Sequence, residues 1–233
     1  MSYGNDGLCL GLVGGLGLGS AIHYYQELAK VHADRGLVLN LTMVHADVNR
    51  VLRQAAAGET DLLAEYLSGL IKRMADAGAQ LAVIPSVTPH ICEPRLREIT
   101  PLPLVSLVEE IVREIGVRKV KRVALLGTRF TVETGMFGRL QGVEVIPPEA
   151  GEIDEIHSAY LEIVSAGRGT EGLYQRLRRI AHRLCERDGV ETIILAGTEL
   201  SLVFHPENTD FPCIDGARLH LDAIMHAVFQ AAG

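Results

Sequence analysis

The sequence predicts an α/β protein built from two similar halves, each a doubly wound parallel sheet. Two observations favour this fold class. Short runs rich in β-branched residues or leucine recur along the chain, each closed by Gly, Pro, Ser or Thr and followed by a segment with helical periodicity. Such alternation is typical of parallel βαβ units. The order of elements in the first part of the chain also returns in the second part.

Each strand is predicted from its apolar run and each helix from its 3.6-residue periodicity. The expected strands are Cys9–Val13, Val38–Val44, Leu81–Pro85, Leu104–Leu107, Val123–Gly127, Glu144–Ile146, Thr192–Ala196 and Cys213–Asp215. The expected helices are Ala21–Arg35, Thr60–Ala77, Val108–Ile115, Thr131–Leu140, Glu152–Ala166, Thr170–Arg187 and Ala217–Ala231.

The internal repeat is clearest in two pairs of strands. Cys9–Val13 with its glycine turn corresponds to Val123–Gly127, and Leu81–Pro85 corresponds to Thr192–Ala196. We therefore expect two flavodoxin-like halves related by an approximate twofold axis. Ligands of open α/β sheets bind outside the carboxyl ends of the strands, so a ligand cleft is expected between the halves. The first half is predicted to comprise residues 1–100 and 206–233, and the second half residues 101–205.

Composition excludes several classes of protein. With 48% hydrophobic and 22% charged residues among 233, the chain should fold throughout. A formal net charge of -7 argues against a nucleic-acid surface, which needs clustered Lys and Arg. No run approaches about 18 apolar residues, and no basic segment precedes the apolar amino terminus, so neither a membrane span nor a signal peptide is expected. A cytoplasmic location is the resulting expectation.

The four cysteines are expected to be reduced thiols. Cys9, Cys92, Cys185 and Cys213 lie far apart in the sequence and form no CxxC pair. This spacing fits neither a disulfide framework nor a zinc site. No metal site is therefore predicted.

A glycine-rich turn follows the first strand and opens the first helix. Gly14, Gly15 and Gly17 allow backbone amides to approach an anion closely, with the helix dipole behind them. Gly15 is thus a candidate binding residue in a cradle for a small anion or carboxylate. A dinucleotide site is a weaker alternative, because the run fits GxGxxG only loosely and Asp47 comes too late for the ribose. A tight turn without a ligand is the third alternative.

The segment from Pro85 to His90 ends a predicted buried strand. Its position would place the hydroxyls of Ser86 and Thr88 at the floor of the cleft. A serine nucleophile needs a base within reach and a strained GxSxG turn, and neither is visible. Ser86 can equally be a strand-end cap, and His90 can be a functional group or a structural histidine at a helix start.

Two predicted strands of the second half, Thr192–Ala196 and Val123–Gly127, are also followed by residues with polar side chains. Gly197 would permit a close backbone approach, Thr198 can donate to a carboxylate, and Glu199 could titrate if its surroundings exclude water. The structural alternative is that Thr198 and Glu199 cap the next helix. At the other strand end, Thr131 is predicted as a helix N-cap and Thr128 is predicted to face the ligand.

Five motifs, in this order, resemble the aspartate/glutamate racemase superfamily, and aspartate racemase in particular. The resemblance covers nearly the whole chain. The motifs are Gly14-Gly15-Leu16-Gly17 with Tyr24-Tyr25, Ile84–His90, Val123–Thr128, Ile194–Leu200, and Ile214-Asp215 with His220. The resemblance implies a homodimer that needs no cofactor and acts on a small carboxylate or carbonyl compound. Charge and hydropathy already predict no nucleic-acid or membrane partner. Thr88, Thr128 and Thr198 match the threonines that hold the substrate carboxylate in this family.

The resemblance breaks at the catalytic thiols. In the family, two cysteines flank the substrate carbon, and one removes a proton while the other delivers one. Its usual motifs read Pro-Cys-Asn-Thr-Ala-His and Gly-Cys-Thr-Glu, whereas this chain has Pro-Ser-Val-Thr-Pro-His and Ala-Gly-Thr-Glu. Ser86 and Gly197 therefore stand at the thiol positions. A thiol ionises readily to a thiolate that can act as a base, whereas a serine hydroxyl hardly ionises near neutral pH, and glycine supplies no group. Its small size is expected to leave room for a bulkier ligand.

The expected function is a cofactor-independent racemase or isomerase-like enzyme acting at a carbon next to a carboxylate or carbonyl, without the usual two-thiol mechanism. Ser86, Glu199 and His90 are the candidate catalytic residues, and Cys92 and His205 are further candidates by placement. Two alternatives stay open. One is a non-catalytic homologue that binds a small carboxylate, and the other is a decarboxylase or lyase of the same superfamily.

Overall fold

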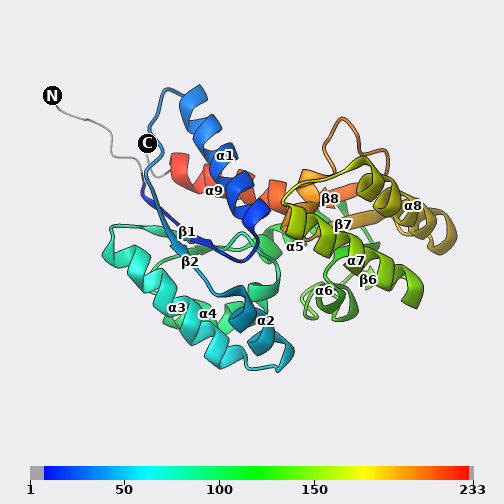
Figure 1. Ribbon diagram of the computed structural model, residues 1–233, viewed down its shortest axis with the longest axis horizontal. Coiled ribbons are helices and arrows are strands. Elements are labelled where there is room, and N and C mark those ends of the chain that lie inside the picture. Colours follow the sequence, from blue (N-terminus) through cyan, green and yellow to red (C-terminus); the bar gives the residue numbers. More distant parts are fainter. Residues whose placement is uncertain (1–7, 231–233) are drawn as a thin grey trace. The chain divides into compact units, whose positions relative to one another are not determined.

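Two four-stranded parallel sheets organise the chain (Figure 1). The computed structural model describes residues 8–230. The strand orders are β2-β1-β3-β4 and β6-β5-β7-β8, so the same order occurs in both sheets. This confirms the predicted α/β class with two similar doubly wound halves.

The first sheet is covered by helices on both faces. Figure 1 shows α1 and α9 over one face and α3 over the other. Its strands are β1 (Leu10–Gly14), β2 (Leu41–His45), β3 (Leu81–Val83) and β4 (Leu104–Val105). Its helices are α1 (Leu18–Asp34), α2 (Val48–Ala56), α3 (Thr60–Asp76), the 3-10 helix η1 (Thr88–Cys92), α4 (Glu93–Ile99) and the larger part of α9 (Gly216–Gln230).

The second sheet repeats this plan with shorter outer strands. Its strands are β5 (Arg122–Gly127), β6 (Glu144–Val145), β7 (Thr192–Ala196) and β8 (Cys213–Asp215). Its helices are α5 (Leu107–Arg118), α6 (Arg129–Glu133), α7 (Ala150–Ala166), α8 (Glu171–Asp188) and the 3-10 helix η2 (Thr198–Leu202).

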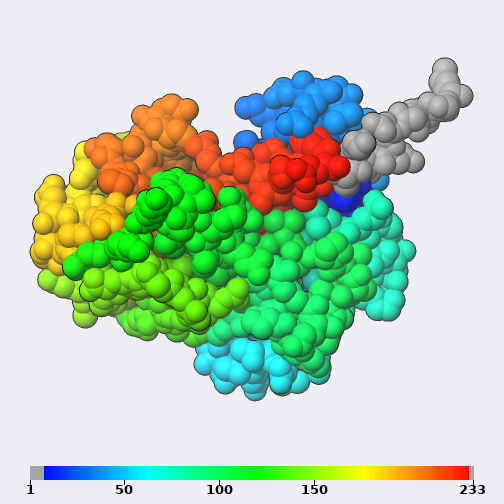
Figure 2. Space-filling view, turned by 180° about the vertical axis from the view of Figure 1, so that it is seen from behind, coloured from blue at the N-terminus to red at the C-terminus, as the bar shows by residue number. Residues whose placement is uncertain are grey.

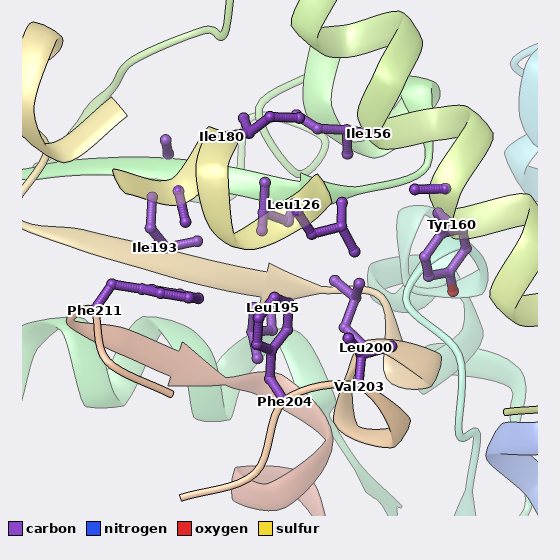
Figure 3. Packing of buried hydrophobic residues seen from close by; sticks show 14 of the residues in the cluster. Leu126, Ile156, Tyr160, Ile180, Ile193, Leu195, Leu200, Val203, Phe204 and Phe211 are labelled. Carbon is purple, nitrogen blue, oxygen red and sulfur yellow. The ribbon is translucent and has the colours of Figure 1, made fainter. Parts of the chain in front are cut away.

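Apolar side chains of α7 and α8 pack on β5 and β7 to form the core of the second sheet (Figure 3). Ile156 of α7 and Ile180 of α8 face Leu126 and Ile193 of the strands. All residues of β7 are buried. A strand covered on both faces has no exposed side along its length, so polar chemistry is left to its ends.

Several local predictions were wrong. Three helices, α2, η1 and α4, were not predicted from the sequence. Asp47, considered above as a ribose ligand, is instead the N-cap of α2. Its side chain accepts hydrogen bonds from the backbone N–H groups of Asn49 and Arg50. The expected helix Thr131–Leu140 is instead α6, which ends at Glu133. Met136 and Phe137 have φ of 54° and 62°, a left-handed backbone that cannot continue a helix.

The chain divides into two compact units at other positions than the sequence suggested. The first unit runs to Ser106 and resumes at His220, and the second is Leu107–Leu219. The predicted boundaries at 100/101 and 205/206 separate β4 and β8 from their neighbours. However, β4 pairs with β3 and β8 pairs with β7, which explains the shift. The parts of the predicted first half at residues 1–7 and 231–233, including Ala231 of the expected last helix, lie outside the described residues.

The part of the chain that the structure describes contains no helix with the length and hydropathy needed to cross a membrane. Its four cysteines are unpaired, as the sequence predicted. Within residues 8–230, no cluster of three or more His, Cys, Asp or Glu side chains could hold a metal ion.

A buried polar chain links three elements of the first unit. The hydroxyl of Tyr24 lies 3.1 Å from Nδ1 of His220, and Nε2 of His220 lies 3.0 Å from the carbonyl oxygen of Val105. Because a carbonyl only accepts, Nε2 carries the proton and Nδ1 accepts from Tyr24. Burial, followed by the neighbouring charge of His90, lowers the pKa of His220 to about 3. The ring is therefore neutral.

Truncation of a core leucine should be costly in the second unit. Leu177 of α8 is 0% exposed, so Leu177→Ala should lower the free energy of unfolding by about 2–5 kcal/mol because it leaves a cavity. Leu161 of α7 is 50% exposed, and Leu161→Ala should cost less than about 1 kcal/mol. Urea unfolding of both variants measures the difference; equal losses would contradict this packing.

Acid should destabilise the fold through His220. The folded-state pKa of about 3 lies below the unfolded value of about 6.5, so the unfolded chain takes up the proton first. The contribution of the neutral His220 ring to the free energy of unfolding is complete above about pH 6.5. It is lost as the pH falls toward 3, at up to about 1.4 kcal/mol per pH unit. Urea unfolding between about pH 7 and pH 5 should show a steeper loss for the native chain than for His220→Gln.

The matched control is His226→Gln, at an exposed position on the same helix. This variant should keep the pH dependence of the native chain. A His220→Gln protein with the native pH dependence would show that the buried ring is not the source.

Candidate active site

The turn after β1 requires glycine. Gly15 has φ of 84°, and a Cβ there would lie 2.5 Å from the carbonyl oxygen of Ala46. The backbone N–H of Ala46 donates to the carbonyl of Gly14 at 2.9 Å, which joins this turn to the end of β2. The chain then enters α1 directly, so the predicted placement of the glycine turn at a helix start is what the structure has.

Beside this turn lies a pocket of about 240 Å³. Its walls come from Gly14 and Gly15, from α1 and from the end of β2, and they include Leu18, Ile22, Tyr25 and Met43. These four side chains are all exposed. The predicted anion cradle is therefore bordered mainly by apolar side chains, and His45 also lines it.

The segment after β3 is fixed by hydrogen bonds to its backbone. Ser20, in the first turn of α1, donates from its hydroxyl to the carbonyl of Pro85 at 2.9 Å. Ser86 follows and is half-buried, and Thr88 begins η1 and is buried. The two hydroxyls predicted for this strand end are thus both located there.

His90 supports this segment through the backbone. Its Nδ1 lies 2.8 Å from the carbonyl oxygen of Ser86, so Nδ1 carries the proton and donates. The bond goes to the carbonyl and not to the hydroxyl of Ser86. It does not activate that hydroxyl as a general base would, and a serine–histidine nucleophile pair is not formed by this contact.

Sequence reasoning missed a buried carboxylate near His90. Glu93 accepts from the hydroxyl of Ser106 at 2.8 Å and from Nε of Arg97 at 2.9 Å. Burial acts to raise the pKa of Glu93, but His90, Ser106 and Arg97 outweigh it, and the pKa is lowered. Glu93 is therefore an ionised, paired group.

In the second unit, the ends of β5 and β7 approach each other closely. A Cβ on Gly127 would lie 2.6 Å from the carbonyl oxygen of Ala196. Thr128 is the N-cap of α6: its Oγ1 accepts from the backbone N–H of Thr131 at 3.2 Å and contacts the Thr131 hydroxyl at 2.9 Å. The cap is thus Thr128 and not Thr131, because the helix begins two residues earlier than predicted, at Arg129.

Glu199 is a buried carboxylate just beyond the end of β7. It is 2% exposed, as is Thr198, and its Oε2 accepts from the hydroxyl of Thr198 at 3.2 Å and from the hydroxyl of Tyr160 in α7. The N-cap of η2 is Gly197, so Thr198 and Glu199 are the first residues of η2 and do not occupy the cap position. The sequence predicts that Glu199 could titrate where its surroundings exclude water, and this side chain is buried.

Tyr160 was not identified from the sequence. Figure 3 shows its ring coming from α7 beyond the end of β7, beside the segment that carries Leu200. A Cβ on Gly197 would lie 2.8 Å from Cζ and 3.0 Å from the hydroxyl oxygen of this ring. The expectation that glycine leaves room for a bulkier ligand is therefore wrong, because Tyr160 fills that space.

The phenol of Tyr160 is held in its neutral form. Burial first, and then the charge and hydrogen bond of Glu199, raise its pKa well above 10. The backbone N–H of Glu199 and the nearby Thr198 hydroxyl act in the opposite direction. Tyr160, Thr198 and Glu199 thus form a connected cluster in the second unit.

The other candidates are less suited to proton transfer. Cys92 is buried, its thiol points to the carbonyl of Pro89 at 3.2 Å, and burial raises its pKa to about 12. A thiolate is therefore strongly disfavoured there. His205 is exposed and belongs to the segment between η2 and β8. Figure 2 draws this segment in orange.

Comparison with known proteins gives the family. Residues 13–224 match the family described as Asp/Glu/Hydantoin racemase. The crystal structure of a candidate Asp/Glu racemase from Yersinia pestis is 27% identical, with 96% of this chain and 100% of that chain covered and a TM-score of 0.80.

Two further structures show the same fold at lower identity. An aspartate racemase homologue from Pyrococcus horikoshii is 23% identical, with 95% and 99% of the two chains covered and a TM-score of 0.77. The aspartate racemase of Picrophilus torridus is 17% identical, with 96% and 95% covered and a TM-score of 0.72. Since the family match spans nearly the whole sequence, this chain belongs to the Asp/Glu/Hydantoin racemase family.

Proposed function

We propose that the protein is a cofactor-independent racemase or isomerase-like enzyme that moves a proton at a carbon next to a carboxylate or carbonyl group, without a pair of catalytic thiols. The observation that carries this proposal is the buried carboxylate of Glu199 at the carboxyl end of β7, with the hydroxyls of Thr198 and Tyr160 donating to it. Buried titratable groups at strand ends are typical of acid–base sites.

Glu199 is the proposed proton acceptor in the second unit. In the first unit, the bond of His90 Nδ1 to the Ser86 carbonyl fixes the orientation of the His90 ring. A fixed ring with Nδ1 engaged would exchange its proton through Nε2. Ser86 then contributes a hydroxyl at the strand end and not a base.

Each unit offers hydroxyls or backbone amides that are proposed to bind a carboxylate group. Thr88 and Thr128 follow β3 and β5, and the Gly15 turn precedes the amino terminus of α1. Neutral donors at such strand ends and helix starts bind carboxylates without adding a competing positive charge.

A carboxylate base restricts the substrate. The ordinary pKa of Glu, about 4.3, is lower than that of a thiol, about 8.5, so Glu199 is a weaker base unless its surroundings raise it. The proposed chemistry is therefore best suited to a C–H bond that is more acidic than that of an amino acid. A carbon next to two carbonyl groups, or in a hydantoin ring, meets this requirement.

One observation favours a second candidate function, a binding protein for small carboxylates. Ser86 after β3 and Gly197 after β7 stand where the family has cysteines, and burial raises the pKa of Cys92 to about 12. Burial likewise raises the pKa of Cys185 and Cys213. A chain that retains strand-end threonines without a usable thiol would bind a carboxylate and leave its carbon unchanged.

Proton NMR in deuterium oxide should separate the two functions. The purified protein is incubated with a panel of amino acids, 2-substituted malonates, maleate and hydantoins. We expect deuterium to enter a carbon next to a carboxylate or carbonyl in at least one compound, or carbon dioxide to be released. A compound that raises Tm without any exchange would favour the binding protein.

Removal of the carboxylate charge should abolish most of the exchange. Glu199→Gln keeps the shape of the side chain and should lower turnover by about 10²-fold or more, the usual contribution of a general base. Glu186→Gln, at an exposed position of α8, is the control and should retain native turnover. If a Glu199→Gln/His90→Gln double variant kept native turnover, these roles would be refuted.

A further inference from the structure

The two ends of the Tyr160 side chain lie in different surroundings. Its ring belongs to the apolar cluster that α7 and α8 form with β5 and β7. Its hydroxyl reaches the polar group formed by Glu199 and Thr198 at the end of β7. A phenol thus brings a titratable oxygen to the strand end while its ring is anchored in the core.

The phenol oxygen has both kinds of hydrogen-bond partner. It donates to Oε2 of Glu199 and accepts from the backbone N–H of Glu199, while the single hydroxyl proton of Thr198 goes to the same Oε2. The carboxylate can take the phenol proton, and the backbone N–H can stabilise negative charge that develops on the oxygen, which keeps a second lone pair for a proton from the substrate. These contacts suit an oxygen that passes a proton on.

Gly197 gives the hydroxyl its position. A side chain at 197 would begin 3.0 Å from the phenol oxygen and 2.8 Å from Cζ. Any larger residue would displace the ring, so glycine at the strand end and tyrosine in α7 depend on each other. The oxygen of Tyr160 consequently occupies the place where the side chain of residue 197 would project.

We propose that Tyr160 is a catalytic residue that exchanges the proton with the substrate carbon and relays it to Glu199. The inference rests on the proposed function. The phenol oxygen takes the proton of the C–H bond while its own proton passes to Oε2 of Glu199. One C–H bond and the former Tyr160 O–H bond break, and new O–H bonds form on Tyr160 and Glu199. The electron pair stays on the substrate as an enolate, and the reverse sequence returns a proton.

The experiment compares Tyr160→Phe with the native chain on the panel compound that exchanges deuterium. Loss of the hydroxyl should lower kcat by about 10²-fold or more and leave KM within a few-fold, since only proton transfer is affected. The Tyr160→Phe/Glu199→Gln double variant should lose no more kcat than either single variant, because the two groups act as one relay. Tyr174→Phe is the control: this hydroxyl donates to the Asn208 carbonyl in the same unit and should be dispensable for turnover.

A second variant keeps the hydroxyl in place. 3-Fluorotyrosine at position 160 has nearly the same shape and a more acidic phenol, and it should shift the pH profile of kcat to lower pH. Native kcat in Tyr160→Phe, or an unshifted profile with fluorotyrosine, would overturn the role of Tyr160 and leave the proposed function intact. No exchange by the native chain with any panel compound would overturn the proposed function and this inference with it.

The packing on which the proposal depends can be tested without a substrate. Gly197→Ala should lower Tm by several degrees because the new Cβ meets the ring of Tyr160. In a Tyr160→Ala background, Gly197→Ala should lower Tm much less. Equal losses in both backgrounds would show that the ring does not lie against Gly197 and would overturn the proposal.

Discussion

Burial of both faces of each parallel sheet is the constraint on which the rest of the molecule depends. The central strands β1, β5 and β7 are buried almost throughout, and their apolar side chains leave no position for chemistry along the strands. Polar groups therefore collect in the short segments that follow the strands. Thr128 comes directly after β5, and Ser86 and Thr198 follow the ends of β3 and β7 closely.

Each unit also buries a carboxylate near a strand end, but the two carboxylates have different kinds of hydrogen-bond partner. Glu93 is paired with the guanidinium of Arg97 and with Ser106, an arrangement that holds it ionised and structural. Glu199 receives hydrogen bonds from the neutral hydroxyls of Tyr160 and Thr198. A hydroxyl can give up its proton or take one back, whereas a guanidinium cannot. This difference explains why the proposed chemistry is assigned to the second carboxylate.

The sequence was sufficient for the strands and for the placement of the hydroxyls, because alternating apolar runs and turn residues are local signals. Short helices such as α2 and α4 lack a long apolar stripe and were missed. The position of Tyr160 could not be inferred, since an aromatic residue in a helix usually indicates core packing and its contact with Gly197 joins residues far apart in the chain. The role of His90 in holding the Ser86 carbonyl also depends on the three-dimensional path of the turn.

The interlock between Gly197 and Tyr160 limits how this sequence can diverge. A substitution that adds a side chain at 197 meets the tyrosine ring, and a smaller residue at 160 leaves a void in the core. Neither position can change alone without a loss of stability, so the order of substitutions is constrained, and shrinkage at 160 has to come first. The two positions should therefore covary, so homologues that carry a side chain at 197 should carry a smaller residue at 160.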